Sequence, residues 1–265
     1  NDPRLTSMIS YYKETGVGFF VITVTSANQI VSSFSSDEGL TWSGANTLTG
    51  EAFGSINLAR APIFKNNDIL NCLYMNTAGT IEFLELANFP TNTTNWTLAQ
   101  SRPSGQVAGC PNLDAQMYGD DKIVVVYGNA GLGNTVNVKV FNASDYTELQ
   151  TVSFDLPNVG DDLLYLQNMI QVQNHLIVPW GFGRTVDTDK SNGYFILDLE
   201  NITLAPVFTT LDLVKFTAGV NATFQAGLGM DSNQNIGVSY FTNFSNSILD
   251  AKFINLNNHV NLNWF

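Results

Sequence analysis

The chain has 265 residues and a net charge of −12, with 44% hydrophobic residues and only 13% charged ones. The hydrophobic content is enough for a sizeable core and excludes a largely disordered chain. With 11 Lys and Arg against 23 Asp and Glu, the protein repels nucleic acid and anionic membranes, so neither is an expected partner. No apolar run approaches the ~20 residues of a spanning helix, so membrane insertion is not expected.

The predicted elements are short apolar strands, and they recur in chain order as one unit. Each copy has a first strand, a polar hairpin turn, an apolar second strand, a third strand and a weaker fourth one. The second strands begin at Val17, Ile69, Ile123, Leu176 and Ile236, which lie 52, 54, 53 and 60 residues apart. The predicted strands are 8–12, 17–24, 29–34 and 40–42; then 59–64, 69–75, 80–86 and 95–98; then 113–118, 123–128, 135–141 and 147–154; then 166–172, 176–182, 193–199 and 204–210; and last 224–230, 236–241, 248–254 and 259–265.

This period predicts an all-β fold, a single five-bladed β-propeller with three or four antiparallel strands in each blade. Radial closure removes the exposed edges that a large open sheet would leave. The blades are expected at approximately 5–50, 56–100, 110–155, 162–210 and 220–265, in one domain that spans residues 1–265. A pair of β-sandwiches is the alternative, and it explains the regular period less well.

One motif lies between the third and fourth strands of the first blade. Ser35, Asp37, Gly39, Thr41 and Trp42 fit the pattern Ser-x-Asp-x-Gly-x-Thr-Trp. Asp37 can accept N–H groups across a turn, and Gly39 can supply a positive φ. The motif resembles the Asp-box of sialidases and related propellers, which implies a structural turn with the Trp42 ring buried between blades. A weaker copy, residues 142–147, lacks the Gly and the Trp.

The sialidase resemblance implies three arginines that hold a substrate carboxylate, because the planar guanidinium pairs well with it. The chain has four arginines: Arg4, Arg60, Arg102 and Arg184. The Arg-Ile-Pro motif of those enzymes is missing, and they generally have six blades. A sialidase site therefore receives little support from the residues.

A second resemblance is to five-bladed glycoside hydrolases of the arabinanase and xylosidase type, based on Asp2-Pro3 ahead of the first strand and on Asn112-Leu113-Asp114. It implies Asp2 as the general base and Asp114 as the aspartate that tunes the pKa of the acid. The general acid should be a Glu that opens the fourth blade, where the chain has Asp161-Asp162 instead. Asp162 is the one substitute available for a reaction that needs two carboxyl groups. The alternatives are a solvated terminus for Asp2 and a polar residue near the axis for Asp114.

Other residues indicate ligand binding. Counted nine residues before each second strand, the blades carry Met8, Arg60, Asp114, Gln167 and Gly227. An axial funnel with Arg60, Asp114 and Gln167 can hydrogen-bond sugar hydroxyls, unless Arg60 and Asp114 simply pair with each other. Trp180 and Arg184 can add a stacking ring and a guanidinium, or the Trp180 ring packs between blades instead.

A weak calcium motif has Asp187, Asp189 and Ser191 at alternate positions, the spacing of calcium loops, with its glycine one place late. No other cofactor is expected. The two cysteines, Cys72 and Cys110, either form a disulfide or remain as two buried thiols.

With 31 Asn and 42 Ser and Thr, the composition favours an extracellular or cell-surface location for a secreted protein. At this composition, chance alone predicts a similar number of N-glycosylation sequons to the six found. The candidate sites are Asn92, Asn95, Asn142, Asn201, Asn221 and Asn243.

The sequence therefore favours a propeller without catalytic activity that serves as a recognition or adhesion module, with a glycan or glycoprotein as its ligand. One alternative is a glycoside hydrolase with an atypical pair of carboxyl groups. Another is a structural subunit of a surface layer or filament, because the surface is polar and nearly uncharged, and homo-assembly belongs to that reading.

Overall fold

The structure is a computed structural model. It describes residues 6–13, 16–24, 30–47, 63–66, 68–76, 78–91, 93–106, 113–129, 133–156, 163–166, 169–172, 174–183, 189–203, 206–215, 227–230, 236–245 and 248–255.

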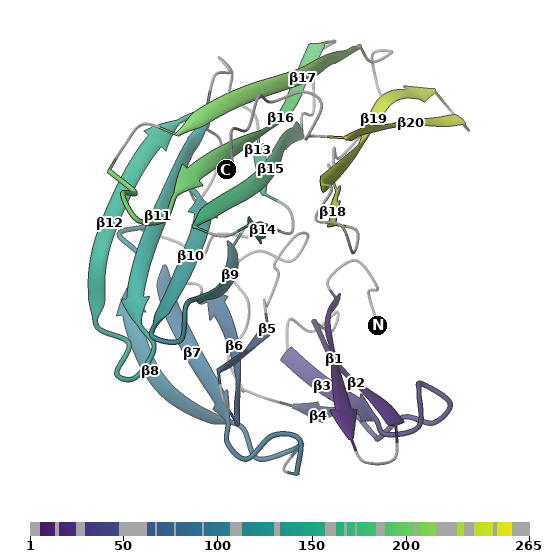
Figure 1. Cartoon of the computed structure of the whole chain (residues 1–265), viewed down its shortest axis with the longest axis vertical. Helices are drawn as coiled ribbons and strands as arrows, with labels where there is room; N and C mark the ends of the chain where they lie inside the picture. The colour runs from purple at the N-terminus through teal and green to yellow at the C-terminus, as the bar shows by residue number, and fades with distance from the viewer. Residues whose placement is uncertain are drawn as a thin grey trace. The chain divides into compact units, whose positions relative to one another are not determined.

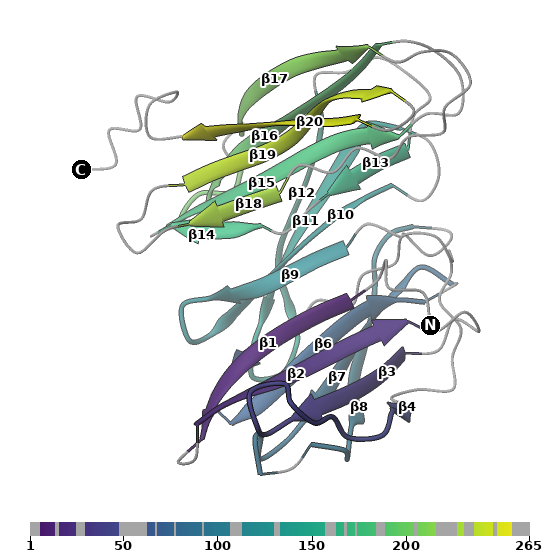
Figure 2. The same ribbon diagram turned by 90° about the vertical axis from the view of Figure 1, so that its right-hand side faces the viewer.

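All regular secondary structure in these residues is β-strand, in five antiparallel sheets (Figure 1). Within each sheet, strands that follow one another in the chain pair with one another, as Figure 2 shows for β1 to β4, except that β13 and β14 both pair with β15. The strands of the first two sheets are β1 (Thr6–Lys13), β2 (Gly16–Val24), β3 (Ile30–Ser35), β4 (Asn46–Thr47), β5 (Ile63–Asn66), β6 (Ile69–Met75), β7 (Thr80–Leu86) and β8 (Thr97–Pro103). Those of the third sheet are β9 (Leu113–Tyr118), β10 (Lys122–Gly128), β11 (Thr135–Asn142) and β12 (Glu148–Asp155). The last two sheets contain β13 (Leu163–Leu166), β14 (Ile170–Val172), β15 (His175–Gly183), β16 (Asp189–Asp198) and β17 (Val207–Lys215), then β18 (Gly227–Met230), β19 (Ile236–Ser245) and β20 (Ile248–Asn255).

The chain divides into two compact units. The first contains Asn1–Ala130 and Val138–Thr151, and the second contains Gly131–Asn137 and Val152–Phe265. The first unit thus holds the first two sheets, β9, β10 and part of β11 and β12. None of the described residues forms a helix of the length and apolarity that a membrane crossing requires.

The predicted second strands are confirmed as β2, β6, β10, β15 and β19, each beginning within one residue of its predicted start. Their continuous apolar runs reflect burial on both faces: β6 is buried from Leu70 to Met75, and β10 from Ile123 to Gly128. The last strands of these sheets are different, because most residues of β8 and β12 are exposed or half-buried. A half-exposed strand carries a weaker apolar signal.

Two predicted strands differ from the structure, and a third is not tested by it. Residues 40–42 form a turn, and the last strand of the first sheet is the two-residue β4. The predicted strand 166–172 is two separate strands, β13 and β14, which pair with opposite ends of β15. The predicted strand 259–265 lies outside the described residues.

The core of the first unit lies between neighbouring sheets. Phe20 of β2 packs edge-on against Phe89, with ring centroids 5.6 Å apart, and also contacts Trp96. Phe83 of β7 packs against Phe141 of β11 in the same way, at 5.1 Å. Aromatic pairs of this geometry stabilise the fold by more than the burial of their apolar area alone. The buried members of the first cluster are Phe20, Ile22, Leu70, Cys72, Tyr74, Leu84, Leu86 and Phe89.

Candidate functional site

The first strands of the sheets lie beside one another within each unit. In the first unit β5 lies next to both β1 and β9, and in the second β14 lies next to β18 (Figure 1). Residues on these strands are therefore the ones that a ligand shared between sheets would contact.

Strand pairing shows which positions of the first strands are equivalent. Asp114 pairs with Val126, the fourth residue of the predicted second strand. The residues in the same place are Ile9, Ile63 and Gly227. Counting nine residues back along the chain thus gives Met8 where the pairing gives Ile9, because the hairpin connections differ in length. Arg60, which the same count gives, lies outside the described residues. A one-residue slip moves a side chain to the opposite face of its sheet.

Asp114 is a carboxylate in a row of otherwise apolar or glycine residues. Its side chain is 8% exposed, and its Oδ1 accepts a hydrogen bond from the N–H of Ala115 at 3.0 Å. No other described first strand contains an acidic residue. Burial of a carboxylate is costly unless hydrogen bonds compensate, which makes Asp114 the most distinctive polar residue of the described first strands.

Gln116 extends the polar face of β9. It lies two residues after Asp114, so both side chains emerge on the same side of the strand. The Nε2 atom of Gln116 is buried and makes no hydrogen bond within the described part of the chain. Sequence analysis missed this residue, although a second polar side chain two positions after Asp114 was a visible signal.

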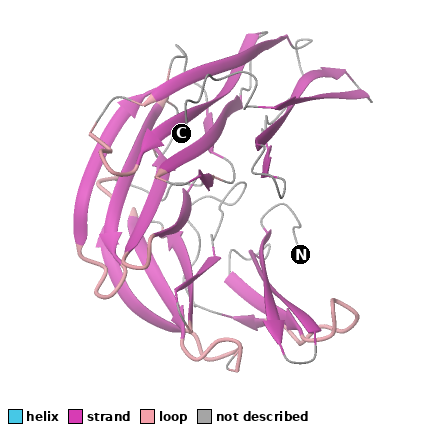
Figure 3. Ribbon diagram, viewed as in Figure 1, coloured by secondary structure: helices cyan, strands magenta, loops and turns pink. Residues whose placement is uncertain are grey.

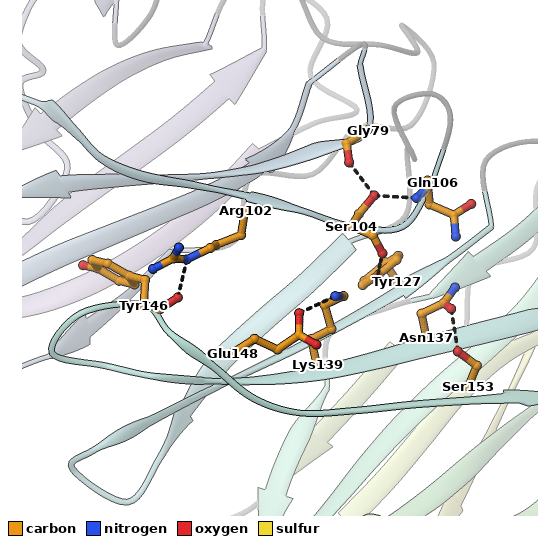
Figure 4. Close-up of polar contacts among 10 residues, drawn as sticks. All are labelled: Gly79, Arg102, Ser104, Gln106, Tyr127, Asn137, Lys139, Tyr146, Glu148 and Ser153. Carbon is orange, nitrogen blue, oxygen red and sulfur yellow. Dashed lines mark hydrogen bonds and ion pairs between the residues drawn. The ribbon is translucent and has the colours of Figure 1, made fainter.

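A group of hydrogen bonds fixes the chain just before β9. Ser104 Oγ donates to the carbonyl of Gly79 at 2.5 Å and accepts the N–H of Gln106 at 3.0 Å (Figure 4). The hydroxyl of Tyr127 donates to the carbonyl of Ser104 at 2.5 Å. Gln106 Nε2 also donates to Asn129 Oδ1, at 3.1 Å. Asn129 follows the end of β10 that pairs with the start of β9, so amide side chains gather at the same sheet end as Asp114.

Most of the other predicted site residues lie outside the described residues: Asp2, Arg4, Arg60, Asp162, Gln167, Arg184 and Asp187. Three proposals therefore stay predictions: catalysis by Asp2 and Asp162, a ligand funnel that includes Arg60 and Gln167, and ligand binding by Arg184. Of the four arginines, Arg102 is described. It donates from Nε to the carbonyl of Tyr146 at 2.6 Å and from Nη2 to that of Asp145 at 3.1 Å, so it holds a turn of the protein itself.

Trp180 does not offer a stacking surface in this structure. It lies on β15 with no exposed area, which corresponds to the alternative that the ring packs inside the protein. The sequence could not distinguish the two, because an aromatic residue at the end of an apolar strand fits either.

The turn after β3 has the hydrogen bonds expected from its sequence. Asp37 Oδ1 accepts the Ser35 hydroxyl at 2.8 Å and the N–H of Thr41 at 2.9 Å, and its Oδ2 accepts the Thr41 hydroxyl at 2.5 Å. These bonds from Thr41 and Ser35 hold the pKa of Asp37 below its ordinary value. Gly39 has φ +87°, and its N–H donates to Ser35 Oγ at 2.8 Å.

The expectation that Trp42 is buried between blades is wrong. Its side chain is 46% exposed, and its Nε1 donates to the carbonyl of Gly39 at 3.1 Å. That bond folds the ring back over its own turn, where no neighbouring sheet covers its exposed part.

The calcium motif is not a loop over its described part. Asp189, Ser191 and Gly193 belong to β16, with an irregular register between Ser191 and Gly193. Asp187 lies outside the described residues, so calcium binding by these three residues stays a prediction. The described residues contain no group of three or more His, Cys, Asp or Glu that could hold a metal ion.

Cys72 is a buried free thiol of β6, and Cys110 lies outside the described residues. Among the sequons, Asn95 and Asn201 are exposed and Asn142 is half-buried, and Asn243 lies on β19. Asn92 and Asn221 are outside the described residues.

The sequence matches no protein-family model and no curated protein. Solved structures share its fold at low identity. The endo-arabinase from Bacteroides thetaiotaomicron has a TM-score of 0.52 at 13% identity, covering 96% of this chain and 94% of the enzyme. A fucoside complex of the Aleuria aurantia lectin has a TM-score of 0.52 at 10% identity, with coverages of 94% and 77%. A polysaccharide lyase of the ulvan lyase type has a TM-score of 0.62 at 8% identity, with coverages of 95% and 68%.

These similarities establish a β-propeller fold of antiparallel sheets and support the resemblance to arabinanase-type propellers. The sialidase resemblance stays a prediction.

Proposed function

We propose that this chain is a secreted or cell-surface five-bladed β-propeller that recognises glycans and has no catalytic activity of its own. The observation that carries the proposal is Asp114, a buried carboxylate at a first-strand position where the aligned residues are Ile9, Ile63 and Gly227. The five sheets of the described residues support the number of blades.

The chemistry of this face suits an uncharged polyol. The Asp114 carboxylate accepts hydrogen bonds from sugar hydroxyls, and the buried Nε2 of Gln116 donates one to a hydroxyl oxygen. Hydroxyl groups act as donors and acceptors, so one sugar can satisfy both side chains. A net charge of −12 disfavours polyanionic glycans as ligands.

The fold supports this class of ligand without deciding between binding and hydrolysis. The similar structures include a lectin in complex with a fucoside and carbohydrate-active enzymes. Because one fold hosts many functions, this support is analogy, and the site itself must carry the argument.

A glycoside hydrolase is the second candidate, favoured by the endo-arabinase similarity together with the position of Asp114 on β9. Hydrolysis needs two carboxyl groups across the scissile bond. Asp2 and Asp162 are the residues that the resemblance and the sequence provide for this role.

A binding experiment tests the proposal. The protein is screened on a glycan array, and affinities for α-methyl-L-fucoside and linear arabino-oligosaccharides are measured by calorimetry. We expect Asp114→Asn to weaken binding by about tenfold or more, or ~1.4 kcal/mol, because the carboxylate no longer accepts a charge-assisted hydrogen bond. Asp120→Asn is the matched control, since Asp120 is exposed in the turn after β9.

The two candidates predict different results with aryl arabinosides and xylosides. The binding module gives no turnover with either substrate. Turnover that both Asp2→Asn and Asp114→Asn abolish would establish the hydrolase instead. An array without any bound glycan, for a protein with a native melting profile, would reject the binding function.

A further inference from the structure

Two exposed apolar side chains lie close together on the turn after β3. Of the large hydrophobic residues described, four are strongly exposed, and two of them are Leu40, 85% exposed, and Trp42, 46% exposed. Figure 3 shows this segment as a loop beyond the end of the first sheet. Two large apolar side chains that stay exposed on one turn are available to contact a ligand.

The turn is rigid, which separates it from an ordinary flexible loop tip. Asp37 and Ser35 accept hydrogen bonds from three positions inside it. The N–H of Ser43 donates to the carbonyl of Phe34 at 2.9 Å, and Phe34 N–H donates to Ser43 Oγ at 3.0 Å, closing its base. The Trp42 ring is itself fixed through Nε1. Because the ring is already fixed, a ligand that binds it loses less free energy to the ordering of the side chain.

Polar residues make up much of the turn that carries the ring. Thr41 and Ser43 flank Trp42 in the chain, and Asn46 Nδ2 donates to the carbonyl of Thr94 at 2.6 Å, which joins the turn to the segment before β8. Asp37 and Glu38 lie in the same turn. The surface is therefore one aromatic ring among hydroxyl, amide and carboxylate groups.

The size and charge of this surface favour one kind of occupant. One Trp and one Leu provide far less than the roughly 800 Å² that each partner of a stable protein interface buries. Two acidic residues in the same turn, Asp37 and Glu38, on a chain with a net charge of −12, oppose an anionic lipid surface. An uncharged sugar ring matches a small apolar area with a polar rim, because its C–H face stacks on the negative π face of an indole while its hydroxyls reach polar neighbours.

We propose that Trp42, with Leu40 beside it, is a stacking site for an uncharged pyranose unit of a glycan. This inference rests on the glycan-binding function proposed above and adds a contact that is separate from Asp114. The turn adjoins the end of β1, since Ser35 pairs with Phe19 near the start of β2, whereas Asp114 is the second residue of β9.

The test uses the full chain labelled with 5-fluorotryptophan. The four tryptophans, Trp42, Trp96, Trp180 and Trp264, give separable ¹⁹F resonances, and Trp42→Phe assigns the one of interest. The probes are xylohexaose, β-1,3-galactotriose and α-methyl-L-fucoside. We expect at least one to shift the Trp42 resonance, in the native protein and equally in Asp114→Asn.

Calorimetry with the responding probe completes the test. Trp42→Ala should weaken binding at this site by about tenfold, and Trp42→Phe by less, because a smaller ring keeps part of the stacking area. Leu98→Ser, which changes an exposed leucine of β8, should leave affinity unchanged. Melting curves establish that each variant is folded, and the ¹⁹F shift needs no substitution at position 42.

Two results would overturn this inference without contradicting the proposed function. In the first, sugars bind and Asp114→Asn abolishes that binding, but the Trp42 resonance does not shift. In the second, phosphatidylcholine vesicles shift the Trp42 resonance and sugars do not. If no probe moves the Trp42 resonance, the stacking site is rejected, and the Asp114 experiment alone then decides the function.

Discussion

Single carboxylates determine the two turns that follow third strands in the first unit. Asp37 after β3 and Asp145 after β11 each accept a backbone N–H and a threonine hydroxyl, from Thr41 and Thr147 respectively. The weak sequence copy at residues 142–147 therefore keeps the carboxylate chemistry of the motif. Tyr146, with φ +56°, is left-handed like Glu38, the residue that follows Asp37 and has φ +58°.

These bonds predict how the turns respond to pH. Hydrogen bonds from Thr41 and Thr147 lower the pKa values of Asp37 and Asp145 below the ordinary 3.8. A lowered pKa in the folded state means that the stabilisation is complete above the unfolded pKa and is lost as the pH falls through the folded one. In ¹H–¹⁵N spectra, the amide resonances of Thr41 and Thr147 should move with midpoints below 3.8.

Asp37→Asn is the control for that titration, because it should flatten the Thr41 profile and leave that of Thr147 unchanged. A Thr41 midpoint at or above 3.8 would contradict the role given to the carboxylate.

At the scale of residues, the sequence predicted the hydrogen bonds of the turn but not the exposure of the Trp42 ring. The spacing of Ser35, Asp37, Gly39 and Thr41 is enough to specify the hydrogen bonds, since all of them lie within the motif. The exposure of Trp42 depends on what lies beyond the motif, and no local pattern carries that information.

At the scale of elements, Tyr146 links the second sheet to the third. Its hydroxyl lies 3.0 Å from Asn71 Oδ1 of β6 and hydrogen-bonds to Glu85 of β7, and its ring packs on Phe83 at 4.6 Å. Burial raises the pKa of this hydroxyl, and the Glu85 carboxylate raises it further. One hydroxyl proton cannot serve two acceptors, whereas Asn71 Nδ2 is buried without a hydrogen bond to any described residue. With the amide turned over, Nδ2 donates to the hydroxyl and the hydroxyl donates to Glu85.

Tyr146→Phe should therefore destabilise the protein by about 1–3 kcal/mol, because it leaves buried polar atoms of Glu85 and Asn71 unsatisfied. Urea denaturation of the single variant, of Glu85→Gln and of the double variant gives their coupling energy. Additive losses would show that the hydroxyl and the carboxylate do not interact.

Strand positions were easier to predict than strand alignment. Buried second strands such as β6 and β10 are read directly from their apolar runs. The lengths of the hairpin connections decide which residue pairs with which, and polar turns of similar composition can differ in length. For this reason the first-strand residue equivalent to Asp114 is Ile9 in the first sheet, where the count along the chain gives Met8.

At the scale of the whole molecule, Cys72 reports on the core of the first unit. The thiol is completely buried in the cluster between the first two sheets, and desolvation raises its pKa far above the ordinary value. A buried thiol in apolar surroundings is inert, because the thiolate is the reactive form. Modification of Cys72 thus requires this core to open.

In a Cys110→Ser variant, we expect Cys72 to be unreactive toward a disulfide reagent in the native state and to react once urea has unfolded the chain. Mass spectrometry of the unmodified parent protein is the complementary measurement. Rapid native labelling would contradict the burial of Cys72, and a mass 2 Da below the reduced chain would show that it pairs with Cys110.

The link between Arg102 and the turn after β11 has a consequence for how the sequence can change. The guanidinium donates to the backbone carbonyl of Tyr146 (Figure 4) and to that of Asp145, and both carbonyls are present whatever side chains those positions carry. Substitutions in the turn can thus accumulate without breaking this link, while Arg102 itself has no equivalent substitute, since lysine lacks two donors in fixed geometry. An Asp145 substitution should therefore remove the side-chain bonds to Thr147 but keep the link to Arg102, whereas a substitution of Arg102 removes that link.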